Sequence, residues 1–241
     1  MPAWIWFVIA IVTAMAGATL LLRDRAIRSA PNRDRPRWAA LRGWKYTDID
    51  ARILEYWRGG SVAYFGGGGV AAGVVSGSTF TADGRRPVYV LDQMHEGTAD
   101  CVLVAVRCRR MFPVLLELWL PNVPFQRQHM PELLGPVGER YAFVSDLETA
   151  RRVITQDLVE AVEDVGSDIT VVWLEQDWVL AAAPPGVGPA RLERLLRDLG
   201  ELADVVDPLD PSQAAGYGIG QGAEPPSQHI EPVPTDENTG R

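Results

Sequence analysis

The segment LDQMHEGTADC brings together the residue types of a nucleophilic centre, Asp92, His95, Glu96 and Cys101. A thiol can attack an acyl group when an imidazole takes its proton and a carboxylate orients the imidazole. The groups of such a centre normally converge from distant segments, so proximity in the sequence is weak evidence for it. The segment is more simply a polar loop between two strands, with Cys101 as a small core residue. No catalytic residue is therefore assigned.

A second candidate is the glycine-rich stretch GGSVAYFGGGGVAAGVVSG, because successive amide groups without a Cβ can surround a phosphate. A phosphate loop has a Lys and a Ser or Thr directly after its last glycine, and a helix beyond them. Here Gly66–Gly69 lead into Val70 and a strand-like run. The stretch therefore predicts a flexible loop that enters an edge strand, and not a nucleotide site.

The two cysteines, Cys101 and Cys108, lie seven apart in the strand-like run CVLVAVRC, so their side chains should point to opposite faces. Two thiols without a disulfide framework suit a reducing compartment. The histidines have no Cys or His neighbours at the spacing of zinc ligands. We expect no metal and no cofactor. The three histidines are His95, His129 and His229.

Two further groups of residues have both a structural and a functional interpretation. Acidic residues along one expected helix form either a solvated surface, which we favour, or a docking face for a basic partner. They are Asp157, Glu160, Glu163 and Asp164. Four tryptophans fit the core, or they line a groove for an acyl chain or a partner helix. They are Trp57, Trp119, Trp173 and Trp178.

The sequence pattern predicts the elements that position these residues. They form an α+β domain over 36–206, with a mainly antiparallel sheet packed by helices on one face. Hydrophobic periodicity predicts helices over 37–41, 48–57, 146–165 with a break near Thr155, and 189–206. Gly59-Gly60 should end the second helix, and Asp146 should cap the third. Strands are predicted over 73–81, 87–93, 100–107, 114–120, 141–144, 169–174 and 178–183.

Charge and composition argue against one class of protein and indicate a tail. The chain has 241 residues, 47% of them hydrophobic, and a formal charge of −8. Residues 1–45 carry eight basic and two acidic groups, a balance of +6, so the remainder is −14. An acidic body argues against a general nucleic-acid binder. Six prolines and five glycines among residues 207–241 predict a disordered tail that is dispensable for the fold.

The amino-terminal run AWIWFVIAIVTAMAGATLLL, residues 3–22, has no charged side chain and is long enough to cross a bilayer once. A cleaved signal peptide would carry positive charge before the apolar run, whereas here the arginines follow it. We expect an uncleaved anchor, a basic juxtamembrane linker over 23–35, an external amino terminus and a cytoplasmic domain at the plasma membrane. The expected membrane-interface residues are Trp4, Trp6, Arg23 and Arg25.

Small residues recur within the expected anchor and could form a ridge on which a second transmembrane helix packs closely. The alternative is that alanine is simply frequent in this chain. The residues of the possible packing face are Ala10, Ala14, Gly17 and Ala18.

The order of features resembles a known family. The runs RGWKYTDIDARILEYWRGG, ELLGPVGERYAFVSDLETARRVI and VVWLEQDWVLAAAP, after a short amino terminus and one anchor, are similar to the trehalose monomycolate transport factor A family. The resemblance covers residues 1 to about 206. It implies an accessory factor in bacteria that build a mycolic-acid envelope. The partners it implies are a resistance-nodulation-division (RND) lipid exporter of the MmpL type, membrane lipids and other envelope-elongation proteins.

Three functions follow as hypotheses. The first is a non-enzymatic adaptor that supports export of trehalose monomycolate by the RND transporter. The second is a membrane-anchored lipid-binding module that handles an acyl glycolipid directly in a groove between sheet and helices. The third is an enzyme acting on a membrane-proximal substrate, and no set of residues in the sequence meets its geometric requirements.

Overall fold

The computed structural model describes residues 34–67, 69–124 and 130–209, together with positions 13, 15, 17 and 18. The last four positions are helical and exposed, and a Cβ added to Gly17 would meet nothing within 4 Å. No helix within the described part of the chain has the length and apolarity needed to cross a membrane. Several site residues of the expected anchor and linker lie outside the described residues. They are Trp4, Trp6, Ala10, Ala14, Arg23 and Arg25.

Nine strands of the described chain form one antiparallel sheet in the order β1-β2-β3-β4-β9-β8-β5-β7-β6. This confirms the expected α+β domain with a mainly antiparallel sheet. The strands are β1 (Lys45–Asp50), β2 (Val70–Thr81), β3 (Gly84–His95), β4 (Thr98–Arg107), β5 (Leu116–Trp119), β6 (Glu132–Val137), β7 (Arg140–Val144), β8 (Val171–Glu175) and β9 (Trp178–Ala183).

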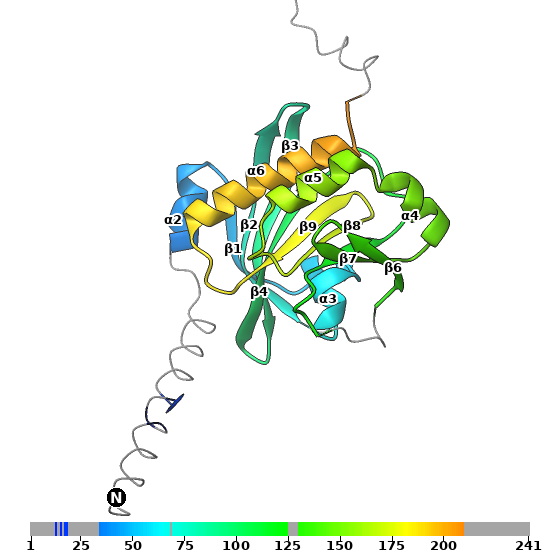
Figure 1. The fold of residues 1–241 in the computed structure, drawn as a ribbon. Coiled ribbons are helices and arrows are strands. Elements are labelled where there is room, and N and C mark those ends of the chain that lie inside the picture. Colours follow the sequence, from blue (N-terminus) through cyan, green and yellow to red (C-terminus); the bar gives the residue numbers. More distant parts are fainter. Residues whose placement is uncertain are drawn as a thin grey trace, which may run out of the picture. The chain divides into compact units, whose positions relative to one another are not determined.

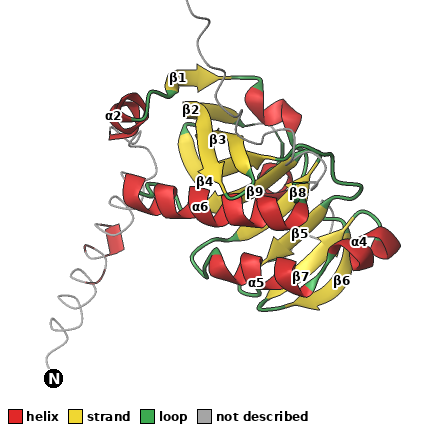
Figure 2. Cartoon of the chain, turned by 90° about the horizontal axis from the view of Figure 1, so that it is seen from above, coloured by secondary structure: helices red, strands yellow, loops and turns green. Residues whose placement is uncertain are grey.

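Helices cover both faces of the sheet, whereas the sequence predicted them on one (Figure 1). The longest, α6, lies along one side of the strands from β2 to β9 (Figure 2). Each face of the sheet has its own hydrophobic core. The leucines of α6 fill the core on one face together with residues of α2, α4 and α5, while η1 and α3 cover part of the core on the other face. The helices are α2 (Asp34–Leu41), η1, a 3₁₀ turn (Ile53–Tyr56), α3 (Gly60–Tyr64), α4 (Leu147–Val153), α5 (Gln156–Asp164) and α6 (Pro189–Val206).

Several local predictions are confirmed by side-chain caps. The expected break near Thr155 separates α4 from α5, and the Thr155 hydroxyl accepts a hydrogen bond from the Leu158 N–H at 3.2 Å. The Asp146 carboxylate caps α4 by accepting from the Thr149 N–H at 2.7 Å. The last helix has the predicted bounds, 189–206.

The prediction of a helix over 48–57 is wrong. Residues 45–50 pair with β2 as an edge strand, and the Asp50 carboxylate then accepts hydrogen bonds from the N–H groups of Arg52 and Ile53 at 2.9 and 3.2 Å. This side chain turns the backbone into η1, so the apolar residues at helical spacing belong to a strand and a 3₁₀ turn. The glycine-rich stretch also differs, because Gly59-Gly60 begin α3 and β2 is the second strand from the edge.

Two buried ion pairs fix the ends of the described domain. Arg35, placed in the linker by the sequence analysis, lies in α2 and donates to the Asp92 carboxylate at 2.7 Å and to the Gly73 carbonyl at 3.2 Å. Asp207, placed in the tail, is 1% exposed and pairs with Arg86 at 3.1 Å. Both predicted boundaries are therefore corrected, because each of these charged residues has a partner on β3.

Candidate functional site around helix α3

Two acidic side chains are buried on the sheet face beneath α3. Glu117 of β5 and Glu175 of β8 are 1% and 7% exposed. The Glu175 carboxylate accepts hydrogen bonds from the N–H groups of Arg58 and Gly59 at 2.8 and 3.0 Å. The Glu117 carboxylate accepts one from the Gly60 N–H at 2.7 Å. Two acids from neighbouring strands thus hold three successive backbone amides.

Two indoles complete the environment of these carboxylates. Trp119 Nε1 donates to Glu117 Oε2 at 2.8 Å, and Trp173 Nε1 donates to Glu175 Oε2 at 3.3 Å. Burial raises the pKa of Glu117, and the nearby negative charge of Glu175 adds to that effect, while the donors of Gly60 and Trp119 oppose it. Each of the four carboxylate oxygens accepts a hydrogen bond, so this acid pair anchors a loop.

The loop that the acids hold requires glycine at two positions. A Cβ at Gly59 would lie 2.7 Å from Leu115 Cδ1. Gly60 has a φ of +57°, and a Cβ there would overlap the Trp173 indole. The Arg58-Gly59-Gly60 segment therefore lies directly on the sheet, and α3 starts from this contact.

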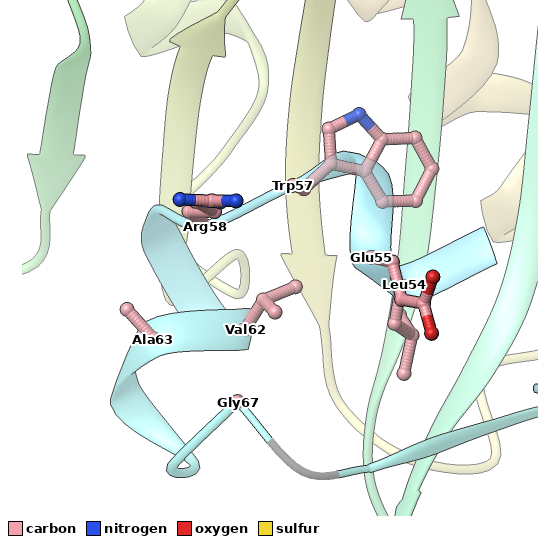
Figure 3. A pocket seen from close by; sticks show the side chains of 7 residues that line it. All are labelled: Leu54, Glu55, Trp57, Arg58, Val62, Ala63 and Gly67. Carbon is pink, nitrogen blue, oxygen red and sulfur yellow. The ribbon is translucent and has the colours of Figure 1, made fainter. Parts of the chain in front are cut away.

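Two cavities flank α3. The first, of about 300 Å³, lies between η1 and α3, and Figure 3 shows Glu55 and Arg58 on opposite sides of it. The remaining residues of its lining are Leu54, Trp57, Val62, Ala63 and Gly67. The second, of about 200 Å³, is mainly apolar. Its lining is Ser61, Tyr64, Phe65, Asp100, Cys101, Trp119, Thr170, Val171, Ala182, Ala183, Pro184 and Pro185.

The residues of the candidate nucleophilic centre are not brought together. Asp92 points to the face covered by α2, where it pairs with Arg35, whereas Cys101 is buried in the core on the opposite face. His95 is the last residue of β3 and is exposed, and Glu96 follows in the turn with a φ of +50°. The turn between β3 and β4 is thus only Glu96-Gly97, shorter than the predicted polar loop, and the rest of the MHEGTAD segment belongs to the two strands.

The two thiols lie on opposite faces of the sheet, as their spacing predicted. Cys101 belongs to the core beneath α3 and Cys108 to the core beneath α6. Burial raises the pKa of each thiol to about 12. Within the described residues, no three His, Cys, Asp or Glu side chains converge as metal ligands would.

The remaining candidates have defined places. The acidic residues of α5, Asp157, Glu160, Glu163 and Asp164, are exposed. The four tryptophans, Trp57, Trp119, Trp173 and Trp178, are all buried on the face beneath α3. Sequence reasoning did not single out Glu117 and Glu175. A carboxylate within an otherwise apolar strand, as in LELW and VVWLE, is the signal that could have found them.

The fold and this site define a class of α+β domain in which buried acids anchor a loop and the described cavities are small. A family model described as trehalose monomycolate transport factor TtfA matches residues 2–241. The chain belongs to this family, as its sequence resemblance predicted.

A curated relative and a solved structure agree with this assignment. The chain is 25% identical over 238 residues to trehalose monomycolate transport factor A of Mycolicibacterium smegmatis (strain ATCC 700084 / mc(2)155), covering 95% of this chain and 80% of that protein. It is also similar to the crystal structure of the mycobacterial trehalose monomycolate transport factor A, TtfA. The TM-score is 0.63 with 25% identity, over 78% of this chain and 99% of that chain.

Proposed function

We propose that this protein takes part in trehalose monomycolate transport as a membrane-anchored accessory factor that binds an RND exporter of the MmpL type and supports it without catalysis. Membership of the transport factor family carries this proposal. The buried acids support the non-catalytic part, because their oxygens are engaged by backbone and indole donors. So do the thiols, whose raised pKa keeps them protonated at neutral pH.

The proposed location is the plasma membrane, with one amino-terminal span, the amino terminus outside and the folded domain in the cytoplasm. The apolar run over 3–22 and the arginines that follow it support this orientation. Fusions at the carboxyl terminus test it. We expect green fluorescent protein to fluoresce there and alkaline phosphatase to be inactive, and an active phosphatase would reverse the orientation.

The alternative function is direct handling of an acyl glycolipid by the domain. Pockets that enclose drug-sized ligands have volumes of about 300–1,000 Å³. The two cavities beside α3, of about 300 and 200 Å³, are therefore too small to enclose a disaccharide with a long acyl chain. Lipid extraction and mass analysis of the purified protein separate the two functions. Bound glycolipid in stoichiometric amount would favour direct handling, and its absence would favour the adaptor.

The transport role is tested by depleting the protein in its native host and following newly labelled envelope glycolipids by chromatography. We expect trehalose monomycolate to accumulate while its downstream dimycolate is lost, because export precedes that conversion. An unchanged lipid profile would overturn the transport role. Restoring the wild-type chain from a plasmid should reverse the change.

The helix ridge in the expected anchor offers one contact for the exporter. Replacing Ala10, Ala14 and Ala18 with leucine should reduce co-purification of the exporter, because larger side chains separate two closely packed helices. Undiminished recovery would move the contact to the folded domain.

A further inference from the structure

Among the described residues, no helix lies over part of the sheet face that carries α3. Phe80 and Arg85 are directly paired across β2 and β3, and Tyr89 and Arg107 lie on the same face of β3 and β4. Arg107 in turn pairs with Trp178 of β9. We name Phe80, Arg85, Tyr89, Arg107 and Trp178 the aromatic ledge. Phe80 is 79% exposed and the Arg107 side chain 53% exposed.

The two arginines of the ledge stack on its rings. The Arg85 guanidinium lies 5.6 Å from the Phe80 ring centroid, and that of Arg107 lies 5.7 Å from the Trp178 ring centroid. Tyr89 is half-buried and its ring lies 5.4 Å from that of Trp178. Each guanidinium also donates from Nε, that of Arg85 to Ser78 Oγ at 2.6 Å and that of Arg107 to Asp177 Oδ2 at 2.6 Å. The terminal N–H groups of the exposed Arg85 match the oxygens of a carboxylate.

The ledge has the opposite charge to the chain. Lys45 of β1 pairs with Ser76, which pairs with Tyr89, so this lysine joins the two arginines on one face. Asp177 at the adjacent turn accepts a hydrogen bond from Arg107 at 2.6 Å. The whole chain carries −8. A positive, aromatic surface on an acidic protein selects an anionic partner that also offers apolar side chains.

We propose that the aromatic ledge docks an acidic protein segment with interspersed apolar side chains. This inference rests on the proposed function and deepens it, because it places a contact for the exporter on the folded domain, at the ledge. Tyr, Trp and Arg dominate the binding energy of protein contacts, and the ledge contains all three residue types. Lipid surfaces are instead recognised by clusters of about 4–8 basic residues, more than the ledge carries. Two copies of the ledge, both positive, would repel one another face to face.

The test measures how much exporter co-purifies with the full chain from detergent extracts of native-host membranes. The ledge variants are Phe80→Ala and Arg85→Glu, both at exposed positions. Their matched controls are Leu133→Ala on β6 and Arg151→Glu on α4, also exposed. We expect about a tenfold or greater loss of affinity for each ledge variant, since truncating a contact hot spot has this effect, and wild-type retention for both controls. Thermal melting of each variant verifies its fold.

The other outcomes each overturn the inference in a different way. If the wild-type chain retains no exporter, the proposed function fails as well. If wild-type and ledge variants retain it equally, only the ledge assignment fails. If Arg85→Glu changes the sedimentation of the purified chain instead, the ledge contacts a second copy.

A lipid surface is examined with an environment-sensitive dye on Phe80→Cys, in vesicles of phosphatidylcholine with or without phosphatidylglycerol. The native thiols are buried, so the label goes to position 80. A blue shift that requires phosphatidylglycerol would assign the ledge to lipid and overturn its assignment to protein. Equal emission in both vesicles is the result expected for a protein-docking ledge.

Discussion

The Glu117 carboxylate accepts a hydrogen bond from the Gly60 N–H at 2.7 Å, and this contact joins β5 to the first residue of α3. Gly60 lies on the Trp173 indole with a φ of +57°. The position of α3, and with it the shape of both neighbouring cavities, therefore depends on one buried acid and on the lack of a side chain at one residue.

Gly60→Ala should destabilise the protein by about 3 kcal/mol, because the new Cβ adopts a left-handed conformation and overlaps Trp173. Urea denaturation measures the change. Gly66→Ala is the matched control, since its φ is +86° but a Cβ there meets nothing within 4 Å. The control should cost about 1 kcal/mol, from backbone strain alone. Equal losses in the two variants would show that the Trp173 contact contributes nothing.

The buried Glu117 should make stability depend on pH. Its pKa in the folded protein is raised by burial, so the folded state binds more protons than the unfolded state at pH values above its usual 4.5. Wild-type stability should therefore fall, relative to Glu117→Gln, as the pH rises from about 4.5 through the raised pKa. Urea titrations of both proteins at a series of pH values measure the difference. A wild-type free energy of unfolding that rises with pH relative to that of Glu117→Gln would contradict the raised pKa.

Breaking the Arg35–Asp92 pair from one side should be costly. Arg35→Met leaves the buried Asp92 carboxylate without its cation and should lower the free energy of unfolding by about 3–5 kcal/mol. The double variant Arg35→Met/Asp92→Leu should recover most of this loss, because no buried charge remains unpaired. A double-mutant cycle by urea denaturation gives the coupling. Additive losses would show that the two residues do not interact.

Asp207 should mark the end of the stabilising structure. Ending the chain after Val206 removes the partner of Arg110 and one of two carboxylate partners of Arg86, whose pair with Asp204 at 2.7 Å remains. It should cost about 2 kcal/mol, the size of the lost hydrogen bonds to charged groups. Ending it after Leu209 keeps these contacts and should leave thermal unfolding unchanged. Asp207→Ala in the full chain should reproduce the cost of the shorter truncation. If both truncations melt alike, the ion pairs at Asp207 add no stability.

The two thiols should resist alkylation in the folded protein. Burial raises the pKa of Cys101 and of Cys108 to about 12, so the reactive thiolate is scarce at pH 8. Iodoacetamide followed by mass spectrometry should find both thiols unmodified in buffer and both modified in urea. The Phe80→Cys variant is a positive control, because position 80 is exposed. Rapid native labelling of Cys101 would reopen the catalytic hypothesis.

Elements that carry their own local signal, an apolar repeat or a capping residue, could be predicted from the sequence. Helix α6 was predicted with its bounds because its leucines repeat at helical spacing, and the start of α4 was predicted from Asp146 as a capping residue. The prediction failed over 48–57, where apolar spacing fits a helix but pairing with β2 and the Asp50 turn determine the backbone. Tertiary pairing of this kind leaves no local pattern.

The candidate site could be predicted only in part. The four tryptophans were placed in the core or along a groove, and Trp57 and Trp119 line cavities as well as the core. Glu117 and Glu175 could not be paired from sequence, since their partners at 58–60 lie far away along the chain. Arg35 and Asp207 were assigned to the linker and tail because their compositions are polar, although each residue has a buried counter-charge.

Both ends of the described domain are fastened to one strand. Arg35 pairs with Asp92 and Asp207 pairs with Arg86, and both of these partners, Asp92 and Arg86, lie on β3. Tension applied between the two ends of the domain would therefore pass along β3 between residues 86 and 92. Strands β5, β6 and β7 lie at the other end of the sheet order, outside this path. A protein held at one end and pulled at the other would thus keep α3 and its acid pair unloaded until β3 yields.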